Sequence, residues 1–370
     1  MRILYVTTIG GTMNFFKEFI KELVISGHKV DIACNDSVSK VSEFFGELGC
    51  KVYSIATSRS PLNKDNIIAM KQIRELVQDK KYDIVHCHTP IAAMCTRLAC
   101  RKIRKQGTRV FYTAHGFHFY KGAPLKNWLM YYPMEKICSY WTDVLITINK
   151  EDYALAKKKM KAKKVEYVPG VGIDLQKFNE VLVDKEAKRQ ELGIPKDAIL
   201  LLSVGELNEN KNHQIIIRAM AELMNLKYHY IIAGKGGKLE ELKKLAEELD
   251  LSNNIHLLGF RNDINELCKI ADIFCFPSYR EGLGLAAIEA MACGLPLVTS
   301  NVHGINDYSE DNVTGYKCSP NDVESFSRNI KRLAESSMLR MKIKENNCRL
   351  AHKYDVKDII CIMKDLYELN

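Results

Sequence analysis

The residues most able to do chemistry lie in a short stretch of the second half, where two carboxylates flank the start of a predicted helix. Glu281 lies in the loop that follows the apolar run 273–277, and Glu289 lies in the Ala-rich helix that comes next. A carboxylate only accepts hydrogen bonds, so it suits hydroxyl groups. At this spacing the two side chains could bind hydroxyls at both ends of a diphosphate, one on a sugar and one on a ribose.

Two glycines between these carboxylates favour a close approach of the ligand to the backbone. Gly282 and Gly284 carry no side chain where the chain turns into the helix. The backbone amides of Gly282, Leu283, Gly284 and Leu285 are expected to point at the ligand with the positive end of the helix dipole, which suits a diphosphate. A lone Glu-Gly turn is often a plain loop, and Glu289 alone could be solvated. Their combination at this spacing favours a binding site.

Two further candidates follow predicted strands of the first half. Gly11 belongs to a glycine pair after the first strand, and its amide is expected to approach the phosphate of the ligand from across a cleft. His115 ends another strand and is expected to face that cleft, although a lone His is more often structural. Residues 121–132 mix basic, aromatic and apolar side chains, so they fit either a loop with a core helix or a contact with a lipid surface.

Short β-branched runs alternate with helical segments along the whole chain. This alternation predicts parallel sheets covered by helices, and therefore an α/β fold of two doubly wound, Rossmann-like domains. The second half illustrates the pattern with strands near 198–205, 228–233, 254–259, 273–277, 295–300 and 315–318. In the first half we expect strands near 2–8, 28–34, 50–55, 82–89, 108–115, 142–149 and 164–169, with a helix over 14–26 after the first of them.

The domain boundary is predicted after the Pro-Gly-Val-Gly turn at 169–172. We expect an N-terminal domain over 1–174, on the side of a second substrate, and another domain over 175–354 that binds the ligand with the diphosphate. The C-terminal helix, about 355–370, is expected to pack back onto the first domain. Because ligands bind outside the carboxyl ends of strands in such sheets, two binding edges are expected to face each other across a central cleft.

Positive charge is concentrated in the first half. Residues 1–175 hold 28 Lys and Arg against 16 Asp and Glu, whereas the remainder holds 26 against 29. The basic runs 97–105 and 157–164 fit solvated helix faces, or attraction to anionic lipid headgroups or a phosphorylated acceptor. No nucleic-acid module accompanies the charge, so we expect no nucleic-acid partner.

The twelve cysteines contain no CxxC pair, and several lie in apolar runs, so we expect reduced thiols. His86-Cys87-His88 looks like a metal-ligand set, yet successive strand residues face opposite sides and no partner cluster is visible. We therefore expect no metal site and no cofactor.

The sequence has no run of apolar residues long enough to span a membrane and no signal-peptide pattern. These features favour a cytoplasmic location. The basic charge of the first half adds the expectation of a peripheral contact with the inner face of the cell membrane.

The segment with Glu281 and Glu289 resembles the EX7E signature of the retaining GT-B glycosyltransferases, specifically glycosyltransferase family 4. The resemblance covers almost the full chain and is strong for a bacterial subgroup that makes capsular and exopolysaccharide repeat units. It implies that Glu281 contacts hydroxyls of the transferred sugar and Glu289 the ribose of the nucleotide. His115 matches the histidine of the family that holds a hydroxyl of the transferred sugar.

Other segments carry the same resemblance. Residues 204–212 resemble the VGRLxxxKG loop of the family, which implies that Lys211 binds the diphosphate; Glu206 stands where the family has its phosphate-binding arginine, and we expect it to contact the acceptor, a sugar amine or a neighbouring base. Gly234 lies in a glycine-rich turn like that near the nucleotide, and Arg261 lies in a loop like that which holds the base.

The resemblance implies transfer of a hexose or N-acetylhexosamine, with retention, from a nucleotide diphosphate-sugar onto an undecaprenyl-diphosphate-linked saccharide. UDP is the favoured nucleotide. The sequence has no Asp-x-Asp motif, so Lys211 and the helix amides are expected to stabilise the leaving diphosphate without an essential divalent ion. Two alternatives stay open: a sugar-nucleotide epimerase or phosphorylase, which turns over donor with no acceptor, and a non-catalytic sugar-nucleotide sensor, which binds donor without releasing nucleotide.

Overall fold

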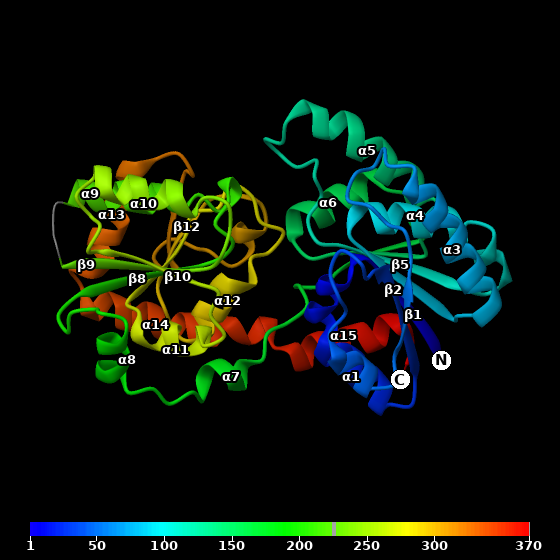
Figure 1. The fold of residues 1–370 in the computed structure, drawn as a ribbon, viewed down its shortest axis with the longest axis horizontal. Helices are drawn as coiled ribbons and strands as arrows, with labels where there is room; N and C mark the ends of the chain where they lie inside the picture. Colours follow the sequence, from blue (N-terminus) through cyan, green and yellow to red (C-terminus); the bar gives the residue numbers. More distant parts are fainter. Residues whose placement is uncertain (224–226, 370) are drawn as a thin grey trace. The chain divides into compact units, whose positions relative to one another are not determined.

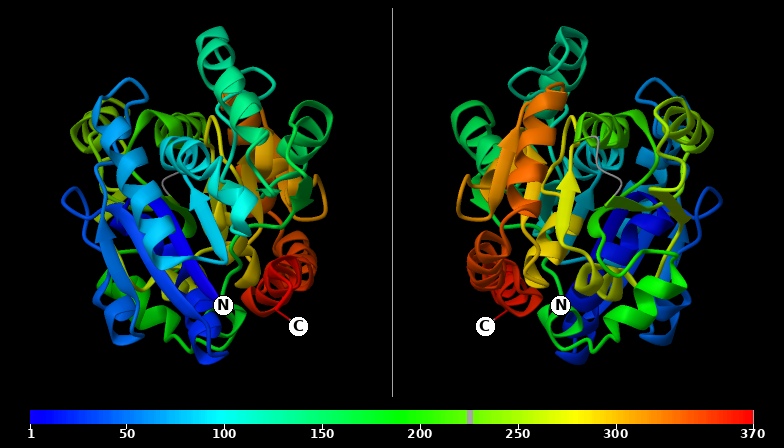
Figure 2. Two further views of the ribbon diagram at one scale, coloured as in Figure 1. Left: turned by 90° about the vertical axis from the view of Figure 1, so that its right-hand side faces the viewer. Right: turned by 90° about the vertical axis from the view of Figure 1, so that its left-hand side faces the viewer.

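The computed structural model describes residues 1–223 and 227–369, which form two compact units. Unit 1 comprises Met1–Val171 and Lys357–Asn370, and unit 2 comprises Gly172–Val356. Each unit is built around its own parallel sheet, with helices on both faces (Figure 1 and Figure 2). The chain therefore forms two Rossmann-like α/β domains.

The sheet of unit 1 has seven strands in the order β3-β2-β1-β4-β5-β6-β7. All of its pairings are parallel. Its strands are β1 (Arg2–Ile9), β2 (Lys29–Asn35), β3 (Lys51–Ser54), β4 (Ile84–His88), β5 (Arg109–Ala114), β6 (Val144–Thr147) and β7 (Lys164–Tyr167). Its helices of five or more residues are η1 (Gly10–Phe16), α1 (Lys17–Ile25), α2 (Glu43–Glu47), α3 (Asp65–Lys80), α4 (Pro90–Cys100), α5 (Leu125–Ser139), α6 (Lys150–Lys159) and α15 (Val356–Tyr367).

Two apolar clusters hold the helices of unit 1 to the two faces of its sheet. One cluster joins β4 and β5 to α3 and α4. The other joins β1 and β2 to α1 and to α15, the last helix of the chain. Polar contacts also fix α15, because Tyr367 Oη lies 3.1 Å from Tyr5 Oη and the Lys364 ammonium contacts Glu22 at 2.5 Å. The C-terminal helix is thus an integral part of unit 1.

The sheet of unit 2 has six strands in the order β10-β9-β8-β11-β12-β13, again with parallel pairings. Its strands are β8 (Ile199–Val204), β9 (Tyr228–Ala233), β10 (Ile255–Gly259), β11 (Ile273–Phe276), β12 (Leu297–Ser300) and β13 (Gly315–Cys318). Its helices of five or more residues are α7 (Leu175–Asn179), α8 (Lys185–Glu191), α9 (His213–Leu223), α10 (Leu239–Glu248), α11 (Ile264–Ile270), α12 (Leu285–Ala292), η4 (His303–Asp307), α13 (Val323–Ala334) and α14 (Ser337–Ala351). Because β8 and β11 are neighbours, the loops that follow them meet at one edge.

One predicted helix is different in the structure. The segment expected to be helical over 14–26 is α-helical only from Lys17, and Gly10–Phe16 forms a 3-10 helix. Gly10 lies against the backbone of Ser39, where a Cβ atom would come within 2.4 Å of the Ser39 carbonyl oxygen. This close approach fixes the first turn after β1 in the tighter form.

Candidate active site

The loop after β8 and the loop after β11 are tied together at the carboxyl edge of the sheet in unit 2. The Asn210 side chain donates to the Arg280 carbonyl oxygen over 2.9 Å, and the Tyr279 amide donates to the Asn210 carbonyl oxygen over 2.8 Å. Asn212 adopts a left-handed conformation with φ 52°, and its side chain donates to the carbonyl oxygens of Pro277 and Pro320. These bonds hold Lys211, which lies between the two Asn residues, at a defined place.

Lys211 and Glu281 form an ion pair at this edge. Lys211 Nζ lies 2.6 Å from Glu281 Oε1, and their side chains are only 20% and 13% exposed. The same ammonium lies 4.9 Å from the centroid of the Phe276 ring, on the last residue of β11. Two residues that the sequence analysis placed at one site are therefore in direct contact, 70 positions apart in the chain.

The helix α12 begins beside this ion pair, and its first amides are open. Within the part of the chain that the structure describes, the amides of Leu283, Gly284 and Leu285 donate no hydrogen bond. Gly284, at the N-cap, has φ +89°. The Glu281 carbonyl oxygen accepts from the Gly304 amide over 3.2 Å. A fixed turn with unused amides at the positive end of a helix binds anions well.

Glu289 lies in the second turn of α12. Its side chain is partly buried, and burial raises its pKa above the ordinary value although the nearby Lys177 acts to lower it. A partly dehydrated carboxyl group gains more from a hydroxyl partner than a fully solvated one does, because the partner replaces lost water.

The other predicted donor contacts occupy different surroundings. Gly234 lies so close to the loop after β8 that a Cβ would come within 1.8 Å of the Gly205 carbonyl oxygen, so it joins two loop backbones. Glu206 is exposed. The Arg261 guanidinium pairs with Asp263, its Nε donating over 2.8 Å, and lies 3.6 Å from Glu191. The structure thus places the Arg261 side chain in an ion cluster of unit 2.

In unit 1, His115 follows β5 and is partly exposed. Its Nε2 lies 3.1 Å from Nδ1 of the buried His88, the last residue of β4. Gly11 lies in η1, where a Cβ would come within 2.7 Å of Ser39 Oγ. The His115–His88 contact was not anticipated from sequence. The signal for it was the His-Cys-His triplet, whose two histidines share one face of β4.

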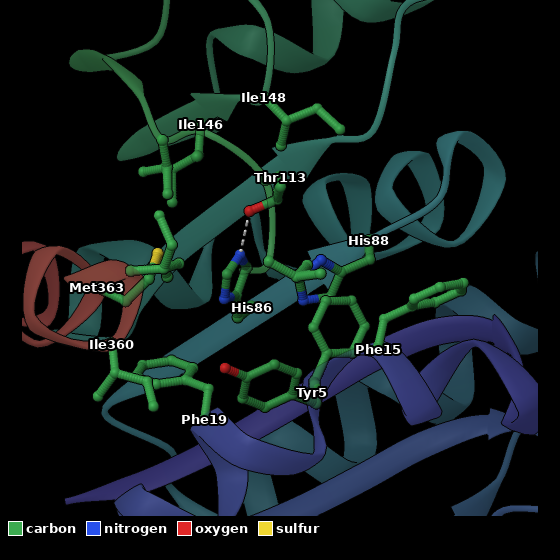
Figure 3. A pocket seen from close by; sticks show the side chains of 15 residues that line it. Tyr5, Phe15, Phe19, His86, His88, Thr113, Ile146, Ile148, Ile360 and Met363 are labelled. Atoms are coloured by element: carbon green, nitrogen blue, oxygen red, sulfur yellow. Dashed lines mark hydrogen bonds between the residues drawn. The ribbon is translucent and has the colours of Figure 1, made fainter. Parts of the chain in front are cut away.

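An apolar pocket in unit 1 is lined in part by His86 and His88. Figure 3 shows these two rings at the centre of the pocket, with Phe15, Phe19 and Met363 among the side chains around them. Both ring nitrogens of His86 are hydrogen-bonded: Nδ1 lies 2.5 Å from Tyr367 Oη, and Nε2 lies 2.8 Å from Thr113 Oγ1. Burial lowers the pKa of His86 to about 3 and that of His115 to about 4, so both rings are neutral at neutral pH.

Unit 1 is expected to lose stability on mild acidification. The folded pKa of His86 lies below its unfolded value, so its contribution is complete above pH 6.5 and falls as the pH drops toward 3. Between pH 7 and pH 5 we expect His86 alone to lower the free energy of unfolding by about 2 kcal/mol. Urea unfolding followed by tryptophan fluorescence measures this, since Trp128 and Trp141 both lie in unit 1. His86→Gln should lose correspondingly less over the same interval, and an identical pH dependence in both proteins would contradict the assignment.

Neither a metal cluster nor a membrane span is found within residues 1–223 and 227–369. No three His, Cys, Asp or Glu side chains in these ranges are grouped to hold a metal ion. Likewise, none of the helices described there combines the length and apolar character that crossing a bilayer requires.

Two Rossmann-like units are the architecture of the GT-B class of glycosyltransferases, and comparison with known proteins places the chain in that class. Residues 184–349 match the family model of glycosyl transferases group 1, and residues 2–149 match that of the glycosyl transferase 4-like domain. A Bacillus subtilis protein named "Putative glycosyltransferase EpsD" is 36% identical over 319 residues, which cover 85% of this chain and 84% of EpsD. The chain therefore belongs to the GT-B glycosyltransferases of the family 4 type.

More distant relatives and solved structures agree with this placement. An Escherichia coli protein named UDP-Gal:alpha-D-GlcNAc-diphosphoundecaprenol alpha-1,3-galactosyltransferase is 28% identical, with 82% of this chain and 81% of that protein covered. The crystal structure of Anabaena Alr3699/HepE in complex with UDP-glucose superposes with a TM-score of 0.83 at 18% identity and covers both chains fully. The structure of WaaG, a glycosyltransferase of lipopolysaccharide biosynthesis, gives a TM-score of 0.78 at 20% identity, with 98% and 99% covered. The fold is thus that of a GT-B enzyme.

Proposed function

We propose that this glycosyltransferase moves a hexose or N-acetylhexosamine, with retention of configuration, from a UDP-sugar to an undecaprenyl-diphosphate-linked saccharide. The observation that carries the proposal is the Lys211–Glu281 pair beside the open amides of α12. Support for the acceptor comes from the names of two relatives, the galactosyltransferase from Escherichia coli and an N-acetylgalactosaminyltransferase from Campylobacter jejuni that acts on a diphospho-undecaprenol. Support for UDP comes from the ligand of the Anabaena structure.

In this proposal each group of unit 2 has a distinct role at the donor. The ammonium of Lys211 and the amides of Leu283 to Leu285 neutralise the diphosphate as negative charge develops on it. Glu281 accepts from sugar hydroxyls, and Glu289 accepts from the ribose hydroxyls. Gly234 shapes the nucleotide end of the site, and the backbone around Arg261 holds the base.

The remaining predicted residues act at the sugar and the acceptor. His115 binds a hydroxyl of the transferred sugar, Gly11 offers an amide to the donor phosphate, and Glu206 contacts the acceptor or a sugar amine. The acceptor oxygen attacks the anomeric carbon on the face that the diphosphate leaves. The bond between the anomeric carbon and the diphosphate oxygen breaks, and its electron pair stays with that oxygen. The proton of the acceptor hydroxyl passes to that oxygen. Because Lys211 and the amides supply positive charge, the reaction is proposed to need no divalent ion.

A donor screen tests this function. The purified protein is incubated with a panel of UDP-, GDP- and dTDP-sugars, each with and without an undecaprenyl-diphosphate-linked saccharide and with and without EDTA. We expect nucleotide release with a UDP-sugar only when acceptor is present, unchanged by EDTA. Conversion of the donor without the lipid-linked acceptor, to an isomeric sugar nucleotide or to a sugar phosphate when inorganic phosphate is supplied, favours an epimerase or a phosphorylase. Binding of the donor without any turnover favours a sensor. Loss of transfer in EDTA overturns the metal-independent step.

We also propose that α5 places unit 1 on an anionic bilayer, where a lipid-linked acceptor lies. Leu125 and Leu129, four residues apart, are 73% and 71% exposed, and Met130 is 48% exposed. Lys121 and Lys126 beside them are exposed as well. A helix that combines exposed apolar side chains with lysines binds at the interface of an anionic membrane.

Vesicle binding measures this contact. Leu125→Glu/Leu129→Glu is expected to weaken binding to vesicles of phosphatidylglycerol roughly tenfold or more, because two apolar side chains no longer insert and two negative charges are added. Ile67→Glu on α3, where Ile67 is 64% exposed, is the matched control and should bind as the native protein does. Equal binding by the double variant and the native protein would show that α5 is not the contact.

A further inference from the structure

The ring of His88 is buried, packed against other aromatic rings and bonded on one side only. It is 1% exposed, and its centroid lies 4.2 Å from that of Phe16 and 5.4 Å from that of Tyr5, both in stacked orientations. Its Nδ1 faces His115 Nε2 at 3.1 Å, whereas its Nε2 has no hydrogen-bond partner among the described residues. Nearby His86 has partners at both ring nitrogens.

The single bond between the two rings contains one proton, and the surroundings decide which ring donates it. Burial lowers the pKa of both His88 and His115 well below the ordinary value, so each ring is neutral and carries one proton. If His115 donated from Nε2, the proton of His88 would be on its Nε2, as a buried N–H with no acceptor. If His88 donates from Nδ1, its Nε2 is only a lone pair. Orphaned buried N–H groups are the rarer and more costly case.

We propose that His88 is a positioning residue that fixes the tautomer of His115. By donating from Nδ1 to His115 Nε2, it leaves the proton of His115 on Nδ1. His115 is partly exposed, so this N–H is the group that it offers to a ligand. The proposal rests on the proposed function, in which His115 binds a hydroxyl of the transferred sugar: that hydroxyl then accepts from His115 Nδ1 and is free to donate elsewhere.

The architecture of unit 1 supports this arrangement. Strands β4 and β5 are neighbours, with His88 opposite Thr113 in the register, so the residue that ends β4 lies beside the turn that carries His115. The His88 ring is buried and lies 4.2 Å from the Phe16 ring and 4.1 Å from the His86 ring, centroid to centroid, so this packing leaves it little room to rotate. Figure 3 shows His88 beside His86 within the apolar pocket.

The tautomer can be read directly, without substrate. In protein labelled with nitrogen-15 histidine, the ring shifts of His115 distinguish a protonated Nδ1 from a protonated Nε2; the signals are assigned by their loss in His115→Gln. We expect the native protein to show Nδ1–H. His88→Leu should mix or reverse the tautomers, and His88→Asn, whose amide can donate from nearly the position of Nδ1, should restore Nδ1–H. An Nε2-protonated His115 in the native protein, or an unchanged tautomer in His88→Leu, overturns the proposal.

Kinetics then connect the tautomer to transfer. We expect His88→Leu to lower kcat/KM for the donor roughly tenfold, the equivalent of one misdirected hydrogen bond, with affinity for UDP unchanged. His88→Asn should recover most of the loss, and His86→Gln serves as the matched control in the same cluster. Because the nitrogen-15 signals are recorded on the free protein, they test the positioning role even if the donor or acceptor proves to be a different sugar.

Discussion

Replacing Lys211 by methionine is expected to lower the rate of sugar transfer at least a hundredfold, the loss typical of removing one group that stabilises charge in a transition state. Methionine keeps most of the apolar stem, which packs where Gly205 leaves room: a Cβ on Gly205 would lie 3.1 Å from Lys211 Cε. The variant therefore removes the ammonium and little else. Steady-state transfer with the best donor of the screen measures the effect.

The ion pair makes a second measurement decisive. In the free protein the ammonium is neutralised by Glu281 at 2.6 Å, so substitutions of the two partners should affect the binding of UDP differently, because UDP lacks the transferred sugar. Lys211→Met should weaken UDP binding. Glu281→Gln should leave UDP binding unchanged or tighten it, because the lysine is released, and should still reduce transfer, because a sugar contact is altered.

A matched control and a double variant complete this prediction. Lys238 is also paired in unit 2, with Glu209 at 2.8 Å, and Lys238→Met should behave as the native enzyme in both assays. If Lys211 served only to hold Glu281, then Lys211→Met, Glu281→Gln and the double variant would show equal losses and equal UDP affinities. That result, or transfer by Lys211→Met within twofold of the native rate, would refute its role at the diphosphate.

The fold could be predicted because buried parallel strands are continuous apolar runs. The strand expected near 198–205 is β8, with the sequence Ile-Leu-Leu-Leu-Ser-Val, and the helix expected at the turn with Gly284 begins at Leu285. The segment 14–26 was predicted less well, since the 3-10 turn over Gly10–Phe16 depends on Ser39, a residue distant in the sequence. Periodicity records which face of an element is buried, but it does not record which loop backbone lies against it.

The contacts within the candidate site could not be predicted from the sequence. The motifs identified Lys211 and Glu281, yet their ion pair forms only because β8 and β11 are neighbours in the sheet. The apolar pattern of a single strand does not predict which strand lies beside it. For the same reason, the hydrogen bond between His88 and His115 could not be predicted, because it joins the end of β4 to the residue that follows β5. The glycine-rich sequence around Gly234 predicts a turn near the nucleotide. The structure shows in addition that Gly234 lies against the backbone of Gly205, a contact that the sequence of such a turn does not predict.

Gly284→Ala is expected to produce the second large effect, on both stability and donor binding. Gly284 has φ +89°, which L-residues rarely adopt, and a Cβ there would lie 2.5 Å from Phe276 Cε1 and 3.0 Å from Tyr308 Oη. Strain and collision together should lower the free energy of unfolding by roughly 2–4 kcal/mol. Relief of the collision must move the N-terminus of α12, so the open amides shift and UDP affinity should fall at least tenfold.

Another glycine of unit 2 separates strain from collision. Gly193 has φ +69° with no atom within 4 Å of its Cβ position, so Gly193→Ala should cost only the conformational strain, about 1–2 kcal/mol, and leave UDP binding intact. Phe276→Leu removes the ring atoms that the new methyl group meets, so it should restore part of the stability of Gly284→Ala. The measurements are urea unfolding and UDP titration of Gly284→Ala, Gly193→Ala, Phe276→Leu and the double variant Gly284→Ala/Phe276→Leu. If Gly284→Ala matched Gly193→Ala in both measurements, the turn before α12 would be more tolerant than its packing implies, and the placement of its amides would not govern donor binding.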